Sequence, residues 1–167
     1  MSKTTPRPVI KIELSPNERT LEFAAVVGIA LSLYVVAVYW ARLPHIVPMH
    51  FGFNGKPDGW GPKWSILILP GVAIFMYALL SILSRYPHKW NYSVPITTEN
   101  AERQYRIALS LIRWIKTGII WLALYAEWTT IRVALGRQNT IGLGIYAFLA
   151  VIMGSVVLHL IWAYKAR

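Results

Sequence analysis

The residues best suited to chemistry in this sequence fall in one short segment, residues 43–64 (LPHIVPMHFGFNGKPDGWGPKW). It contains His45, His50 and Asp58, and two imidazoles with one carboxylate are a ligand set that zinc or iron accepts. Their spacing matches no established metal signature, however, and the segment holds a single acid. We therefore expect His50 and Asp58 to hydrogen-bond each other and the local backbone, with no metal and no cofactor bound.

A second group of candidates lies in the apolar stretch 107–131, which contains Arg113, Lys116 and Glu127. At about 100° of rotation per helical residue, these side chains point within about 40° of one direction and form one polar stripe. Two interpretations stay open. Arg113 and Lys116 could extend to one membrane surface while Glu127 reaches the other. Alternatively, the stripe faces the interior of a helix bundle, where Glu127 would be a proton or cation site.

The composition indicates that these residues are positioned by a membrane protein. Of the 167 residues, 56% are hydrophobic and 14% are charged, whereas an ordinary soluble domain has about 25% charged residues. The net charge of +10 would by itself suggest nucleic-acid binding. With this apolar excess we instead expect the basic residues to contact lipid headgroups, with no nucleic-acid partner. The absence of cysteine excludes disulfides, a thiol nucleophile and cysteine-ligated metals.

Uncharged windows locate the spans. They cover residues 23–41, 64–84 and 138–164, which are 19, 21 and 27 residues long, and about 20 apolar residues cross a bilayer core of about 30 Å. The stretch 107–131 supplies a fourth span, because only three charges interrupt it. We predict an all-α, four-helix transmembrane bundle with a cytoplasmic basic tail at residues 1–20 and a membrane domain at 21–166. The expected spans are about 22–42, 64–84, 107–131 and 140–164.

The basic residues predict the orientation of these spans. With the N-terminus inside, twelve of the seventeen Lys and Arg residues lie on the inner side and five on the outer side, as the positive-inside rule requires. We therefore expect a multi-pass membrane protein with both termini in the cytoplasm. Residues 43–64 then form an outer loop.

The proline and glycine content of this loop predicts an ordered chain of turns. Four prolines and four glycines exclude a helix, and Asn54-Gly55 and Asp58-Gly59 are both dipeptides typical of tight hairpin turns. Aromatic residues such as Trp60 are expected at the membrane interface.

The same loop carries a resemblance to a known family. Its pattern LPxxxPxHFxxxGxPDGWGxK is similar to a bacterial membrane domain of unknown function, which also occurs at the front of immunity and signalling proteins of the SdpI type. The resemblance implies a membrane domain and carries no agreed activity. The matching residues are Leu43, Pro44, Pro48, His50, Phe51, Gly55, Pro57, Asp58, Gly59, Trp60, Gly61 and Lys63.

Small residues also recur every fourth position in two of the predicted spans. They are Ala24, Gly28 and Ser32 in the first span and Ala150 and Gly154 in the last. Such spacing lets helices approach closely, and it serves packing within the chain or packing on a partner equally well.

No recognisable catalytic set is present, so a non-catalytic role is favoured. We predict a membrane protein that binds another membrane protein or peptide, as an accessory subunit of a membrane complex in the lipid bilayer. The alternative is a small membrane enzyme, or an ion- or proton-coupled carrier, that uses Glu127 or the pair His50 and Asp58. The functional candidates are His50, Asp58, Trp60, Arg113, Lys116 and Glu127.

Overall fold

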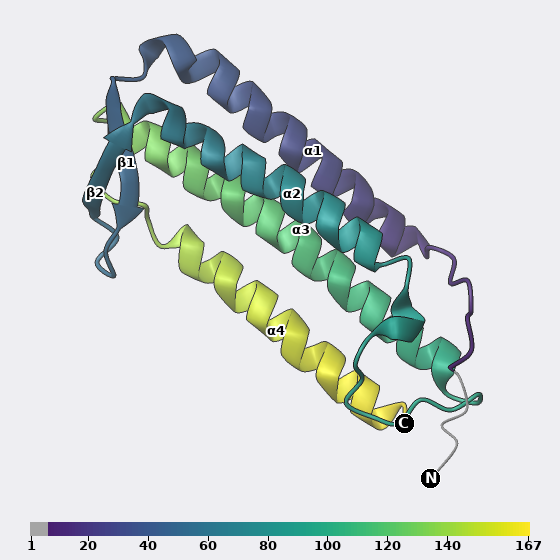
Figure 1. The fold of residues 1–167 in the computed structure, drawn as a ribbon. Coiled ribbons are helices and arrows are strands. Elements are labelled where there is room, and N and C mark those ends of the chain that lie inside the picture. The colour runs from purple at the N-terminus through teal and green to yellow at the C-terminus, as the bar shows by residue number, and fades with distance from the viewer. Residues whose placement is uncertain (1–6) are drawn as a thin grey trace.

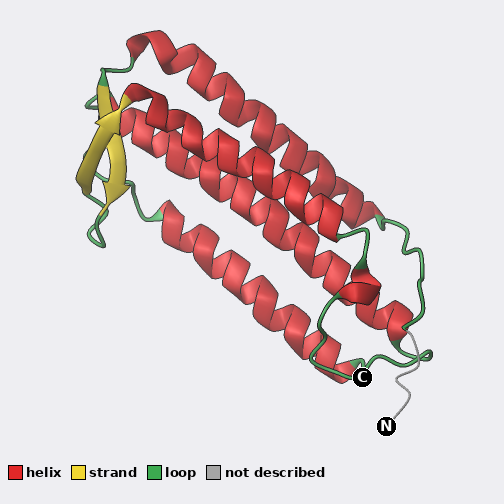
Figure 2. Ribbon diagram, viewed as in Figure 1, coloured by secondary structure: helices red, strands yellow, loops and turns green. Residues whose placement is uncertain are grey.

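Four long helices lie alongside one another, and a two-stranded hairpin covers one end of them (Figure 1; Figure 2). This computed structural model describes residues 7–167, so the first six residues of the predicted basic tail lie outside it. All four helices are long and apolar enough to cross a membrane, which fits the predicted four-helix membrane bundle. The long elements are α1 (Pro16–Tyr39), β1 (Ile46–Phe51), β2 (Pro57–Pro62), α2 (Ile68–Leu83), α3 (Ala101–Ala134) and α4 (Gly144–Lys165). Three short 3₁₀ helices connect them: η1 (Trp40–Arg42), η2 (Lys63–Leu67) and η3 (Pro87–Lys89).

The helix α3 is the centre of the bundle. It packs against α1, α2 and α4, whereas α1 and α2 contact each other more sparsely. Among the described elements, α4 packs extensively on α3 alone, and Figure 1 shows α4 and α1 on opposite sides of the bundle. Side chains of α3 therefore face α1 and α2 on one side and α4 on the other. The charged side chains of α3 can contact polar groups of α1 and α2.

The helix α1 begins at Pro16, six residues before the start of the first predicted span. Ser15 caps it: the Ser15 side chain accepts from the backbone N–H of Glu18, and the Glu18 carboxylate accepts from the backbone N–H of Ser15. This reciprocal capping box, with proline at the first helical position, fixes the helix start. As a consequence, both Glu18 and Glu22 belong to the helix.

The predicted chain of turns is an antiparallel hairpin of β1 and β2, a small exception to the all-α prediction. Its turn contains Asn54-Gly55, and Gly55 has the positive φ of 73° that favours glycine there. The prediction of a second turn at Asp58-Gly59 is wrong, since both residues lie inside β2. Gly59 faces His50 across the hairpin, and a Cβ at Gly59 would lie 3.0 Å from the His50 Cβ. This glycine therefore allows the two strands to approach closely.

The hairpin is fixed to the bundle by a buried apolar cluster. Val47 of β1 is fully buried and packs with residues from α1, α3 and the two connecting segments. A backbone hydrogen bond of 2.8 Å from Ile141 to Gly55 ties the hairpin turn to the segment between α3 and α4. The cluster comprises Val36, Leu43, Val47, Ile66 and Ile131.

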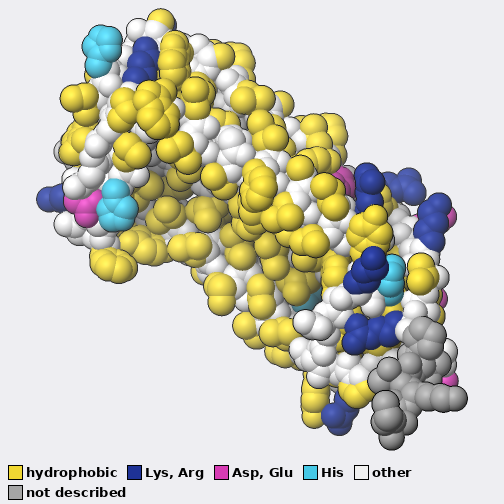
Figure 3. Space-filling model, viewed as in Figure 1, with side chains coloured by type: hydrophobic (Ala, Val, Ile, Leu, Met, Phe, Trp, Pro, Cys, Tyr) yellow, Lys and Arg dark blue, Asp and Glu magenta, His cyan; other side chains and the backbone are white. Residues whose placement is uncertain are grey.

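Side-chain types divide the surface along the bundle. Figure 3 shows hydrophobic side chains over the middle of the visible face, with Lys and Arg gathered mainly toward the end opposite the hairpin. A bundle with an apolar middle and charged ends matches the layering of a lipid bilayer. The structure thus fits a membrane-spanning bundle in contact with lipid.

Candidate functional site

The polar stripe of α3 contains two buried bases that meet two carboxylates of α1. The Arg113 guanidinium lies 2.5 Å from Glu18 Oε1 and 3.8 Å from Glu22 Oε1. The Lys116 ammonium lies 2.6 Å from Glu22 Oε1. The exposed fraction of each side chain is 7% for Arg113, 1% for Lys116, 6% for Glu18 and 27% for Glu22. We call these four residues the ion-pair cluster.

Helix geometry explains why the ion-pair cluster forms. Glu18 and Glu22 are four residues apart on α1, and Arg113 and Lys116 are three apart on α3, so each pair lies on one helix face. Two acids and two bases also cancel, which a site removed from water requires. Of the two interpretations left open by the sequence, the structure has Arg113 and Lys116 inside the bundle.

The helix α2 completes the surroundings of Lys116. The ammonium group donates a hydrogen bond of 3.0 Å to the Ser81 hydroxyl and lies 4.7 Å from the centre of the Tyr77 ring. Lys116 of α3 thereby contacts side chains of both α1 and α2. Its ammonium group links the three helices by polar contacts.

Glu127 occupies a different part of the same helix and has no basic partner among residues 7–167. It is fully buried, and the Ser32 hydroxyl of α1 donates a hydrogen bond to its Oε2. Within the described chain its Oε1 has no hydrogen-bond partner. Eleven residues, or about 16 Å of helix, separate Glu127 from Lys116.

The stripe is therefore interrupted by apolar packing. Between the level of Lys116 and that of Glu127 lies a second buried cluster, formed by Ala25, Ala73, Ile120 and Ala123 from α1, α2 and α3. At the beginning of α3, Arg106 and Glu102 form a separate, exposed pair with 3.0 Å between them. The arrangement provides two separate polar sites and no continuous polar path between them in the described part of the bundle.

His159 of α4 belongs to neither polar site. It is buried, its Nδ1 lies 2.7 Å from the carbonyl oxygen of Ser155, and its Nε2 lies 3.2 Å from the Ser110 hydroxyl of α3. Both ring nitrogens are thus occupied, Nδ1 by a contact within α4 and Nε2 by the contact that joins α4 to α3. A proton relay between His159 and Glu127 is not built into this arrangement.

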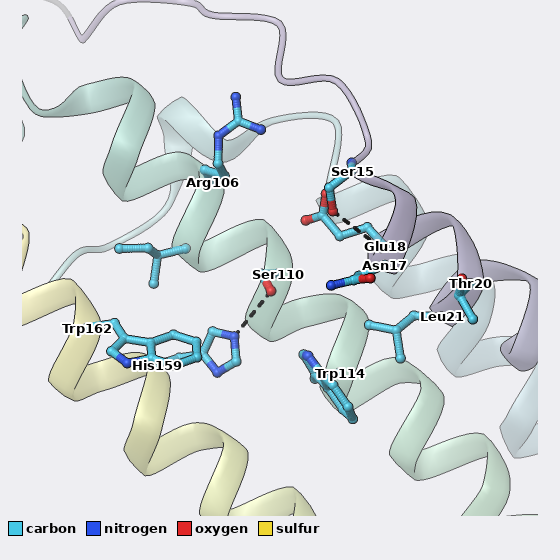
Figure 4. Close-up of a pocket in the computed structure, with 11 residues that line it drawn as sticks. Ser15, Asn17, Glu18, Thr20, Leu21, Arg106, Ser110, Trp114, His159 and Trp162 are labelled. Carbon is cyan, nitrogen blue, oxygen red and sulfur yellow. Dashed lines mark hydrogen bonds between the residues drawn. The ribbon is translucent and has the colours of Figure 1, made fainter.

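A cleft of about 650 Å³ lies beside His159, between α1, α3 and α4. Figure 4 shows the Trp114, Trp162 and His159 rings on its walls, with Asn17 and Thr20 on α1. The walls combine aromatic rings with hydroxyl and amide groups. The cleft exists because α4 packs on α3 and leaves the space between itself and α1 unfilled.

At the other end of the molecule, the hairpin brings His50 and Asp58 together. His50 Nδ1 lies 2.5 Å from Asp58 Oδ1, and both side chains are more than half exposed. His45 is exposed at the start of the hairpin. Within residues 7–167, no three His, Asp or Glu side chains gather as a metal-binding group. Trp60 is 57% exposed on the same hairpin.

Sequence reasoning missed Glu18 and Glu22 as partners of the stripe. Both were placed at or before the edge of the first span, because charge-free windows mark only the apolar middle of a helix. The capping box formed by Ser15 and Glu18 is a signal that could have moved the helix start back.

Comparison with known proteins finds a matching domain model and an uncharacterised relative, each over a part of the chain. Residues 27–74 match the model of a domain of unknown function, DUF1648. That range includes Ser32 and the entire hairpin, but it ends before α3 begins. A protein of Archaeoglobus fulgidus described as uncharacterised is 36% identical over 62 residues, which cover 33% of this chain and 34% of that protein. The chain therefore spans about a third of the length of this relative. No solved structure matches the chain.

Proposed function

We propose that this chain is a non-catalytic, multi-pass membrane protein that binds another membrane protein or peptide, as an accessory subunit of a membrane complex. The observation that carries the proposal is the exposure of α4. Only 6% of its apolar window is buried, against 33% for α3. A helix that packs on a single neighbour presents the rest of its surface to lipid or to a partner.

The small-residue faces of α1 and α4 favour a partner protein over lipid as the neighbour of α4. Gly28 of α1 is used within the chain, because a Cβ there would lie 2.8 Å from Ile120 Cγ2. Gly154 of α4 is not used in this way: no described atom lies within 4 Å of a Cβ built there. Ala150, one turn earlier, is exposed as well. A small-residue face that meets no helix in the chain suits the close approach of a partner's helix.

The proposed orientation follows from the basic residues. We place both termini in the cytoplasm of a bacterium and the hairpin outside its plasma membrane, since the end opposite the hairpin carries most of the Lys and Arg residues. In this orientation Trp60 and the pair His50 and Asp58 face the exterior. We assign His50 and Asp58 to holding the hairpin, because an exposed two-residue pair lacks the ligands of a metal centre.

Site-specific photo-cross-linking tests the proposal. The cross-linking group replaces Val151 or Leu158, which lie on the same helix face as Gly154 and are 60% and 51% exposed. The matched control replaces Phe75 of α2, which is 62% exposed. We expect an adduct of one defined additional protein from the α4 positions and none from position 75.

Two results would overturn the proposal. Lipid adducts alone at all three positions would show that the exposed face of α4 contacts only the bilayer. An adduct of twice the chain's own mass of 19.0 kDa would show a homo-oligomer instead of a complex with another protein.

A further inference from the structure

The buried carboxyl group of Glu127 on α3 takes no part in the exposed α4 face to which partner binding is assigned. We propose that Glu127, together with Ser32, forms a proton-binding site inside the bundle, and that Glu127 holds this proton at neutral pH. The proposal does not depend on the accessory-subunit function.

The surroundings of Glu127 do not support a negative charge. One helical turn away on either side along α3 lie Ala123 and Ile131, each a member of a buried apolar cluster. Val36 lies one turn beyond Ser32 on α1 and belongs to one of these clusters. An ionised carboxylate removed from water needs a cation or several donors, whereas a single hydroxyl donates here.

No charged group of the packed helices reaches this carboxyl. The helix α1 has no charged residue between Glu22 and Arg42, and α2 has none between Lys63 and Arg85. On α3, Lys116 pairs with Glu22 on the other side of the apolar cluster, about one helical turn before Ile120. Arg132 follows Glu127 by five residues, which at about 100° per residue turns it well away from that direction.

Other titratable side chains of the packed elements have partners elsewhere. Tyr39 of α1 packs edge-on against Trp128, and Tyr77 of α2 lies against Lys116. On the hairpin, His50 is paired with Asp58 and His45 is exposed. On α4, His159 is bonded to Ser110 and to its own helix. None of these groups faces Glu127 as a partner in the described chain.

A proton fits this site better than a metal ion. Hard cations take six or more oxygen ligands, and the hydrogen bonds of the described residues bring only the Ser32 oxygen to this carboxyl. A proton bound to the carboxyl requires no further ligand. Release would leave a carboxylate and pass the proton to water, so water must first enter between α1 and α3. Proton release is therefore linked to loosening of the α1–α3 contact.

Infrared spectroscopy of the full chain in detergent micelles that contain no ester carbonyl groups tests the proposal. At pH 7 the wild-type protein is expected to show the carbonyl band of a protonated carboxylic acid, shifted in heavy water. Glu127→Gln is expected to remove the band, and Glu127→Asp to move it. Glu102→Gln is the matched control, because Glu102 is an exposed carboxylate on the same helix, and it should leave the band unchanged.

Each outcome decides the question. A wild-type spectrum without an acid band at pH 7 overturns the proposal without reference to any variant. A band that persists in folded Glu127→Gln also overturns it, because the proton would then lie on another acid. If Glu127→Gln fails to fold, the Glu127→Asp shift makes the assignment, and an unshifted band in that variant contradicts the proposal.

Discussion

Arg113 of α3 lies against Glu18 of α1, with 2.5 Å between Nη1 and Oε1 and both side chains almost completely buried. This pair joins the capping box of α1 to the central helix, because the same glutamate accepts from the backbone N–H of Ser15. One carboxylate therefore takes part both in the start of α1 and in its packing on α3.

Glu18→Gln is expected to destabilise the folded state, because it leaves the buried Arg113 guanidinium without its nearest partner. Breaking a buried ion pair from one side costs about 3–5 kcal/mol. Glutamine retains the capping box, so the loss reports the ion pair and not the cap. Chemical unfolding in mixed micelles measures it.

The double variant Glu18→Gln with Arg113→Gln provides the control for this experiment. It removes both charges, and we expect it to be more stable than Glu18→Gln alone, since no unpaired charge stays buried. Equal losses in the single and double variants would contradict an ion pair between these residues.

Gly28→Leu is expected to disrupt the bundle, while Gly154→Leu is expected to be tolerated by the isolated chain. A side chain at Gly28 meets Ile120, and overpacking of this kind costs about 1–3 kcal/mol. At Gly154 there is open space, and replacement of a helical glycine adds helix propensity. Thermal unfolding of the two variants in the same detergent compares them. Equal destabilisation would show that α4 has a partner helix within the chain.

His50→Gln is expected to change the stability of the hairpin by less than about 1 kcal/mol, because exposed ion pairs contribute little. Added zinc should leave the melting temperature of the wild-type chain unchanged, and a chelator should have no effect. A zinc-dependent rise in melting temperature that is lost in His50→Gln would instead identify a metal site on the hairpin.

The four helices could be predicted from sequence because a bilayer imposes one strong requirement, which is a run of about 20 apolar residues. The same requirement conceals the true helix ends. The predicted tail contains Glu18 and the predicted span begins at Glu22, although the capping box at Ser15 starts α1 before both residues. The helical periodicity likewise predicts that Arg113 and Glu127 lie on the same face of α3. It does not predict that this face packs against α1.

The hairpin shows a different reason for error. Asn54-Gly55 and Asp58-Gly59 have similar composition, but only Gly55 has a positive φ. Gly59 is required by the close approach of His50 across the strands. A sequence shows that a glycine is present. It does not show whether the glycine is needed for a positive φ or for its lack of a side chain.

We propose that α4 presents a face for another membrane protein. The most direct test extracts the chain with its native lipids in polymer nanodiscs and measures the mass of the complex. We predict one additional polypeptide beyond the 19.0 kDa chain, lost in Gly154→Leu and retained in Gly71→Leu, whose glycine also meets open space. A mass of this chain alone, unchanged in both variants, would contradict the account.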